Sequence, residues 1–355
     1  MRPGIIDVHT HYVPRGWPDL SRAVAPADDW PRLRLESERD AVIMVRDDEF
    51  RRIDHRCWDA DVRLAGMDAD GVDTQVVSPT PVFFSYARSA ADGLGICKVF
   101  NDLALDVCAP GGGRLVPFAQ VPLQDPDAAC RELDRCLDAG HRGVEIGNHV
   151  GDDDLDADGV VTFLQHCAAR GAPVLVHPWD MAGGPRTDRW MAQWLTGMPA
   201  ETHLSILAMI LGGVFDRVPD SLRICFAHGG GSFAFWLGRV ENAWHRRNDV
   251  VGTSEQPPSH YVGRFSVDSV VFAEPALRLL VDTLGVGQVM VGSDFPYPLG
   301  EQPVGGVVRR AGFLDDTARA AILRGNAERW LGFQPAADGQ PVNAGDIVGR
   351  QTIPS

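Results

Sequence analysis

Lysine is almost absent from this chain. Lys98 is the only one, and the other basic side chains, apart from histidine, are arginine. A mechanism that needs a lysine, such as Schiff-base formation, would therefore have to use Lys98. That residue lies in the apolar-periodic stretch 94–108, which predicts an outer helix and a solvated surface charge. Lysine chemistry is not favoured.

Long apolar runs and an excess of positive charge are also missing. The longest apolar run, 204–215, is too short to cross a bilayer and predicts a buried helix. The formal net charge of −15 argues against nucleic acid or an anionic membrane as a partner, and favours a small-molecule substrate. Seven cysteines without zinc-knuckle spacing, and no signal peptide before the first predicted strand, predict reduced thiols in a cytoplasmic protein.

What the sequence does contain is a regular alternation of strand-like and helix-like segments. Helix-like stretches, for example 59–71, 125–140 and 315–332, separate most of the strands. This alternation predicts βαβ units, and eight such units predict an α/β fold of the (β/α)8 TIM-barrel type. No GxGxxG follows the first strand, which argues against a dinucleotide-binding sheet. The eight strand-like segments are 4–11, 74–80, 115–122, 143–149, 173–178, 223–229, 265–270 and 289–295.

One long interval breaks this rhythm. Residues 14–56 follow the first strand, and within them 32–37 and 41–47 flank a turn, which predicts a β-hairpin. We expect a small insertion, or lid, over the barrel mouth, with the barrel itself formed by 1–13 and 57–334. The polar segment 335–355 is predicted to be a C-terminal tail, either mobile or wrapped onto a partner subunit.

Histidines and one aspartate mark the ends of four predicted strands. His9 and His11 close the first strand, and alternation places both on one face. His177, His228 and Asp294 follow the fifth, sixth and eighth strands. Active sites of TIM barrels lie at the carboxyl ends of the strands, and histidines scattered through a core would not all fall there. This pattern predicts a metal site.

The types of these side chains suggest the metal and its chemistry. Three imidazoles and one carboxylate, from His9, His11, His177 and Asp294, suit Zn²⁺ with one position open for water. The fourth strand ends in VEIGNH without a lysine that could bridge two metals, which predicts one zinc ion per subunit. His228 opens the segment HGGGS, expected to begin a helix with free backbone N–H groups. It could be a further ligand, but a general acid or base beside the metal water suits it better.

Several longer motifs resemble a known family. HTH together with VHPWDM, AHGGGSFAFWLGRVENAW and GSDFPYPLGE resembles the amidohydrolase superfamily. With EFRRIDHRCWD, the chain is similar to the α-amino-β-carboxymuconate-ε-semialdehyde decarboxylases. The resemblance implies a zinc-dependent homodimer that releases CO2 without oxygen or an organic cofactor. It implies the four ligands and the acid/base His228 named above, and a substrate carboxylate held by Arg51 and by Arg239 of the neighbouring subunit.

One segment supports a dimer independently of the resemblance. Residues 232–244 are apolar nearly all round, more than a helix facing only the barrel requires. A second apolar face predicts a subunit interface, for which an isologous dimer is the usual arrangement. Without the resemblance, Arg51 would be taken for a surface charge and Arg239 for half of a structural ion pair.

The expected reaction is decarboxylation of α-amino-β-carboxymuconate-ε-semialdehyde to 2-aminomuconate semialdehyde by a metal-bound hydroxide. Where the family often has SDYPFP, this chain has SDFPYP, so that Phe295 and Tyr297 are exchanged beside Asp294. This exchange leaves the exact substrate undecided. The alternatives are a decarboxylase of a hydroxybenzoate and an amidohydrolase or lactonase that uses the same metal water. A metal-binding protein without activity is disfavoured, because no ligand and no acid/base residue is missing.

Overall fold

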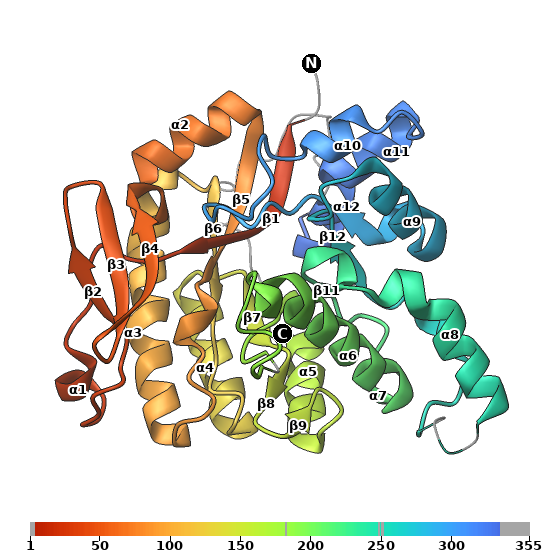
Figure 1. Cartoon of the computed structure of the whole chain (residues 1–355), viewed down its shortest axis with the longest axis horizontal. Coiled ribbons are helices and arrows are strands. Elements are labelled where there is room, and N and C mark those ends of the chain that lie inside the picture. Colours follow the sequence, from red (N-terminus) through yellow and green to blue (C-terminus); the bar gives the residue numbers. More distant parts are fainter. Residues whose placement is uncertain (1–3, 182, 248, 250–251, 334–355) are drawn as a thin grey trace, which may run out of the picture.

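Eight parallel strands form the centre of the molecule. The computed structural model describes residues 4–181, 183–247, 249 and 252–333. Neighbouring strands in the sheet are also consecutive barrel strands along the chain, and helices surround them (Figure 1). In sheet order they are β1 (Ile5–Tyr12), β5 (Val72–Pro79), β6 (Leu115–Ala119), β7 (Gly143–Gly147), β10 (Val174–His177), β11 (Ile224–Phe226), β12 (Ser266–Asp268) and β13 (Val289–Met290).

The segment after β13 closes the sheet onto β1. The amide of Val8 donates to the carbonyl of Val291 at 2.8 Å, and the amide of His11 donates to that of Phe295 at 2.7 Å. The amide of Asp294 in turn donates to the carbonyl of His9 at 2.9 Å. The predicted TIM barrel is therefore confirmed, and its closing contacts place the segment carrying Asp294 directly beside the two histidines of β1.

Apolar side chains fill the interior of the barrel below Asp294 and the two histidines of β1. Val8, Val76, Phe118 and Met290 belong to the inner cluster, and all are buried. The outer faces of the strands pack against the helices in a second, larger cluster. Since both faces are covered, every residue of β1 is buried, including its polar ones. The histidines at its end are consequently held by a rigid, dry scaffold.

The helices follow the strands as the periodicity predicts. The predicted helix 59–71 corresponds to α2, which Asp59 caps, and 125–140 corresponds to α4, which Asp125 caps and Gly140 ends in the left-handed region. The segment 315–332 is helical but contains a π-helical turn at 321–325. The helices are α1 (Leu20–Ala23), α2 (Ala60–Asp70), α3 (Ala90–Cys108), α4 (Pro126–Ala139), α5 (Asp158–Arg170), α6 (Met198–Leu211), α7 (Val214–Arg217), α8 (Phe233–Arg246), α9 (Glu274–Leu284), α10 (Gly306–Arg310), α11 (Asp316–Ala320) and α12 (Asn326–Leu331).

The insertion after β1 is a three-stranded antiparallel sheet rather than a hairpin. Its strands β2 (Arg32–Leu35), β3 (Asp40–Val45) and β4 (Asp48–Asp54) lie at one side of the barrel (Figure 1). The predicted hairpin corresponds to β2 and β3. The third strand was not predicted, because charged residues dominate 47–54 and hide its alternation. The boundaries between barrel and insertion stay a prediction, and the predicted tail 335–355 lies outside the described residues.

Two smaller features complete the fold. A two-stranded ribbon, β8 (His149–Val150) and β9 (Asp153–Asp154), follows β7. The apolar run 204–215 begins inside α6 and extends past its end at Gly212. Ile206, Met209 and Ile210 are buried, whereas Leu204 is exposed, so this helix is buried on one side only rather than throughout. Among the described residues, no helix is both long and apolar enough to cross a membrane.

Candidate metal centre

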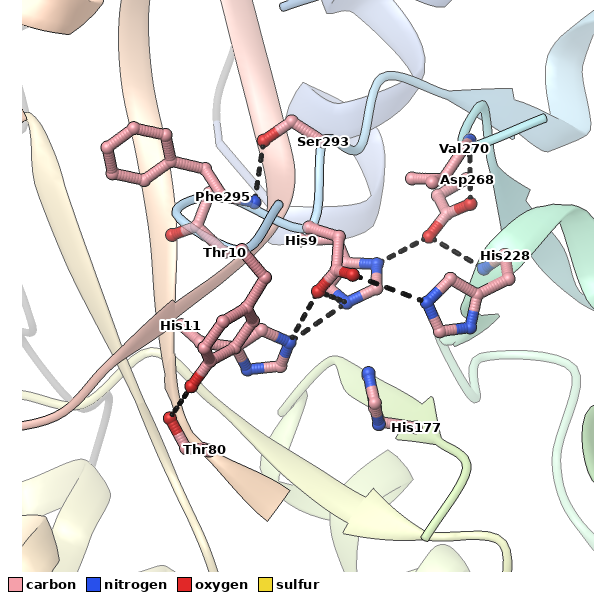
Figure 2. A network of polar contacts seen from close by, with 12 residues as sticks. His9, Thr10, His11, Thr80, His177, His228, Asp268, Val270, Ser293 and Phe295 are labelled. Atoms are coloured by element: carbon pink, nitrogen blue, oxygen red, sulfur yellow. Dashed lines mark hydrogen bonds and ion pairs between the residues drawn. The ribbon is translucent and has the colours of Figure 1, made fainter. Parts of the chain in front are cut away.

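Four of the predicted site residues meet at the carboxyl ends of the strands. His9 and His11 come from β1, His177 is the last residue of β10, and Asp294 follows β13. One ligand atom from each lies within 4.8 Å of all the others. The His9 and His11 Nε2 atoms are 3.1 Å apart, and the Asp294 Oδ1 lies 3.2 Å from the His11 Nε2. Figure 2 shows the three imidazoles pointing toward one another.

The second nitrogen of each imidazole has an oxygen acceptor. The Nδ1 of His9 lies 2.6 Å from an oxygen of Asp268, and that of His11 lies 3.3 Å from the Pro79 carbonyl. The Nδ1 of His177 lies 2.9 Å from the Pro178 carbonyl. Because carbonyl and carboxylate oxygens accept, the proton of each ring belongs on Nδ1. The lone pairs of the three Nε2 atoms are thereby left to face a common point.

The electrostatics of the cluster favour a cation. Burial lowers the pKa of His11 to about 4 and that of His177 well below its ordinary value, so both rings are neutral at pH 7. Burial also lowers the pKa of His9, but the bond to Asp268 and its charge outweigh this and raise it. Burial would raise the pKa of Asp294, yet the surrounding histidines hold it well below the usual range. The site therefore offers neutral imidazole nitrogens from His11 and His177 and an anionic oxygen from Asp294.

These residues fit a zinc ion in chemistry and spacing. Two ligands at about 2.0 Å from a tetrahedral ion are separated by roughly 3.3 Å. The 3.1 Å between the His9 and His11 nitrogens is close to that value. Three nitrogens and one carboxylate oxygen form a set that a borderline divalent metal accepts. The donor set of the cluster therefore fits one such ion.

His228 lies beside the cluster at the barrel mouth. Its Nε2 is 3.9 Å from the second oxygen of Asp294, and its side chain is 15 % exposed whereas that of His9 is fully buried. The Nδ1 of His228 has no hydrogen-bond partner among the described residues. An imidazole that reaches both the cluster and the mouth can exchange protons with a substrate bound there.

The backbone around His228 differs from the expectation. The N–H groups of His228 and Gly229 are not free, because they donate to the two oxygens of Asp268, each at 2.9 Å. The helix α8 begins only at Phe233, after a short turn in which His228 and Gly229 adopt positive φ angles of 55° and 63°. The prediction of free N–H groups at this point is therefore wrong.

Asp268 is the contributor that the sequence analysis missed. It ends β12, and its segment FSVDSV was assigned as a strand without a functional residue. The side chain is fully buried and lies between the ring of His9 and the backbone of His228 (Figure 2). The signal that could have identified Asp268 from the sequence is its position as an acidic residue at the end of a predicted barrel strand.

Arg51 lies above the cluster on the insertion. Strand β4 carries it, and its guanidinium lies 4.6 Å from the ring centroid of Tyr297. The Tyr297 ring is itself 5.6 Å from that of His11, and its hydroxyl is 2.6 Å from the hydroxyl of Thr80. Within the described part of the chain, no carboxylate lies within ion-pair distance of Arg51. A positive charge without a partner is thus held near the metal cluster.

Arg239 is not part of this cluster. It lies on α8 and lines a groove between α6 and α8 together with His203, Leu207 and Trp236. Its guanidinium is 5.9 Å from the Trp236 ring, and it too has no acidic partner in the ranges that the structure covers. Within one chain, Arg239 therefore lines an outer groove rather than the metal cluster.

Comparison with known sequences identifies the family. The sequence model of the amidohydrolase family matches residues 6–333, which include all of the barrel strands except Ile5 and all seven predicted site residues. The chain belongs to the amidohydrolase family. This match confirms the superfamily that the sequence motifs predicted, and it extends over the residues that form the barrel.

Named relatives of this amidohydrolase are decarboxylases. The 2-amino-3-carboxymuconate-6-semialdehyde decarboxylase of Dictyostelium discoideum is 39 % identical over 93 % of this chain and 92 % of its own. The gamma-resorcylate decarboxylase of Rhizobium sp. is 25 % identical over 74 % of this chain and 84 % of its own. The apo structure of IDCase from Metarhizium anisopliae, 23 % identical, superposes with a TM-score of 0.78 over 93 % and 97 % of the two chains, which supports the fold. The prediction of a metal-dependent carboxy-lyase is confirmed.

The fourth barrel strand of this amidohydrolase carries a buried acid. Glu145 on β7 is fully buried, and neither of its oxygens has a hydrogen-bond partner among the described residues. One of them is 3.8 Å from the Nδ1 of His11. Burial raises the pKa of Glu145 well above its usual range.

Proposed function

We propose that this enzyme is zinc-dependent and removes CO2, without oxidation, from α-amino-β-carboxymuconate-ε-semialdehyde, giving 2-aminomuconate semialdehyde. The observation that carries this proposal is that Arg51, which has no acidic partner among the described residues, lies against Tyr297, next to a cluster of three imidazoles and Asp294 with His228 beside it. Such a site suits an anionic substrate that exchanges a proton. The 39 % identity to the Dictyostelium enzyme supports the particular substrate.

Each side chain has a distinct part in this reaction. Arg51 holds a carboxylate of the substrate through charged hydrogen bonds, because a guanidinium matches a carboxylate in shape and stays charged at any working pH. The Phe50 ring lies 5.7 Å from the Arg51 guanidinium and 5.9 Å from the Trp179 ring. A zinc ion held by His9, His11, His177 and Asp294 would act as a Lewis acid and would lower the pKa of a bound water to about 7.

His228 transfers the proton that the substrate carbon needs after CO2 has left. When the carbon–carboxylate bond breaks, CO2 leaves and the electron pair stays on the substrate carbon, which must then receive one proton. The partial exposure of the His228 side chain and the 3.9 Å between its Nε2 and Asp294 suit it for that transfer. No oxidant is needed, because the carbon gains a proton for the CO2 it loses.

We further propose that the enzyme is a homodimer in which Arg239 completes the site of the neighbouring subunit. The outer face of α8 exposes Phe235 by 69 % and Trp236 by 43 %, beside the groove that contains Arg239. An apolar face of this kind is costly in water and is typical of a subunit interface. A second guanidinium supplied across it would hold the substrate's carboxylate from the other side.

A hydroxybenzoate substrate is the second candidate. The observation that favours it is the 25 % identity to the gamma-resorcylate decarboxylase, which covers most of both chains. The two candidates share the metal cluster and differ in the pocket, where Tyr297 lies between Arg51 and His11. Hydrolysis of an amide or lactone with the same metal water is the third outcome to be tested.

The experiment that tests the proposal measures two products of one reaction. Zinc-loaded enzyme is mixed with the semialdehyde, generated in situ from 3-hydroxyanthranilate by its dioxygenase, and substrate absorbance and released CO2 are followed together. We expect one CO2 for each substrate consumed, and no acceleration by the His228→Ala variant. Release of CO2 from 2,6-dihydroxybenzoate alone would favour the second candidate, and substrate loss without CO2 would favour a hydrolase.

A further inference from the structure

Asp268 uses all of its hydrogen-bonding capacity within the site. One carboxylate oxygen accepts from the Nδ1 of His9 at 2.6 Å and from the amide of His228 at 2.9 Å. The other accepts from the amides of Gly229 at 2.9 Å and Val270 at 3.0 Å. Four donors converge on a fully buried group, so only the ionised acid satisfies them all. An amide in its place would direct an NH2 group at two of these donors.

The first consequence of these bonds concerns His9. Its Nδ1 proton is fixed toward Asp268, which directs the Nε2 lone pair at the point where the other ligands converge. Partners of this kind orient a metal-binding imidazole and increase its basicity. Among the described metal-site histidines, His9 alone has a carboxylate as its acceptor, whereas His11 and His177 donate to backbone carbonyls.

The second consequence concerns His228. This residue has a φ of 55°, in the left-handed region that side chains other than glycine rarely adopt. The amides of His228 and of the next residue, Gly229, both donate to Asp268, so the carboxylate stabilises this turn. The turn aims the imidazole at Asp294, with 3.9 Å between the two groups.

We propose that Asp268 is a positioning residue that couples retention of the metal, through His9, to proton transfer, through His228. A single carboxylate thereby sets the distance between the metal site and its acid/base group. The proposal rests on the proposed metal ligands and on the role of His228. It does not depend on which carboxylate substrate the enzyme uses.

The test compares two buried acids. Asp268→Asn keeps the side-chain volume and removes the charge, and Glu132→Gln does the same in α4, where Glu132 contacts Asn101 and Arg135 far from the site. Zinc affinity is measured by competition with a chromophoric chelator, and substituted cobalt(II) reports the ligand field by its visible spectrum. We expect Asp268→Asn to bind zinc roughly 10- to 100-fold more weakly, with a changed cobalt spectrum. Glu132→Gln should retain the affinity and the spectrum of the unsubstituted enzyme.

Steady-state kinetics at saturating zinc test the second half of the coupling. We expect Asp268→Asn to lower kcat while KM changes little, because substrate binding by arginine is left intact. Wild-type zinc affinity together with wild-type kcat in a folded Asp268→Asn variant would overturn the proposal. If Asp268→Asn and Glu132→Gln both lost decarboxylation and both kept the wild-type zinc affinity, Asp268 would have a structural role only.

A measurement on the unsubstituted protein covers the case in which Asp268→Asn does not fold. Proton NMR of the zinc-loaded enzyme should show a strongly downfield, slowly exchanging imidazole N–H for His9, as a short bond to a buried carboxylate requires. Assignment uses selectively 15N-labelled histidine. Absence of such a proton would contradict the proposal, and it would leave the substrate question untouched.

Discussion

Two adjacent arginines on β4 have different surroundings, one near the proposed site and the other in ion pairs at the surface. Arg51 lies over Tyr297 and has no acidic partner among the residues that the structure describes, whereas Arg52 is paired with Glu36 at 2.8 Å and Glu49 at 2.7 Å. Alternation along the strand accounts for the difference. Both arginines belong to the motif EFRRIDHRCWD, and the residue type alone does not indicate which of them faces the site.

We predict that Arg51→Ala and Arg52→Ala differ in activity. Loss of a charged hydrogen bond to the substrate should lower kcat/KM of Arg51→Ala by roughly 10- to 100-fold. Arg52→Ala should stay near the wild-type value, because an exposed ion pair contributes little. Steady-state assays on the zinc-loaded variants provide the measurement. Equal losses in the two variants would mean that β4 acts through its fold rather than through Arg51.

His141 allows a test of stability against pH away from the active site. It is buried, its Nδ1 donates to the Cys136 carbonyl at 3.1 Å, and burial lowers its pKa to about 4. The unfolded chain binds a proton near pH 6.5, and the folded chain does not until about pH 4. Stability is therefore full above pH 6.5 and falls as the pH drops toward 4, by about 2 kcal/mol between pH 7 and 5.

The His141→Asn variant should lose most of that pH dependence. Its amide can donate to the same carbonyl but does not titrate. Urea unfolding at pH 7 and pH 5 gives the two free energies of unfolding, and the exposed His260 provides the control in His260→Asn, which should keep the wild-type difference. An unchanged difference in His141→Asn would show that other groups dominate acid destabilisation.

At the scale of elements, the barrel strands were predictable because they are buried on both faces. The segments 115–122 and 173–178, for example, contain the apolar runs LVPFA and PVLV. The residues at their ends, His177 among them, could therefore be located before the fold was known. Strand β4 escaped because it is partly exposed and rich in charge, so its pattern resembles that of a loop.

The contacts between elements were not predictable in the same way. Nothing in the segment around Asp268 indicates that it lies 2.6 Å from His9, 259 residues away. That proximity arises only from closure of the barrel, which brings the segment after β13 beside β1 and β12 next to β13. The same closure explains why the predicted free amides after His228 have a partner.

Closure also predicts how metal removal affects stability. The four proposed ligands come from β1, β10 and the segment after β13, and a bound ion joins these elements. We expect zinc to stabilise the folded protein, by about 4 kcal/mol at a concentration 1,000 times its Kd. Chelation followed by thermal unfolding should show a lower Tm that zinc restores. His177→Ala should lose most of this response, whereas an equal response in that variant would place the metal elsewhere.

At the scale of the whole molecule, charge and apolar surface are unevenly distributed. The chain carries a formal charge of −15, yet the α6–α8 face combines Phe235 and Trp236 with the unpaired Arg239. A monomer would leave this apolar patch in water and this arginine without an anion. In the proposed dimer, association of two copies through this face would bury the apolar patch and would bring Arg239 to the substrate of the neighbouring subunit.

This arrangement predicts that two inactive variants restore each other. If Arg239 of one subunit completes the site that contains His228 of the other, a dimer of His228→Ala and Arg239→Ala chains has one site with both defects and one intact site. Random pairing on co-expression should then recover about a quarter of the wild-type activity, whereas each variant alone stays inactive. Purification through two different tags isolates the mixed dimer, which should reach about half. If the mixed dimer is as inactive as its parents, Arg239 acts within its own chain, and a monomer in sedimentation experiments would rule out the shared site altogether.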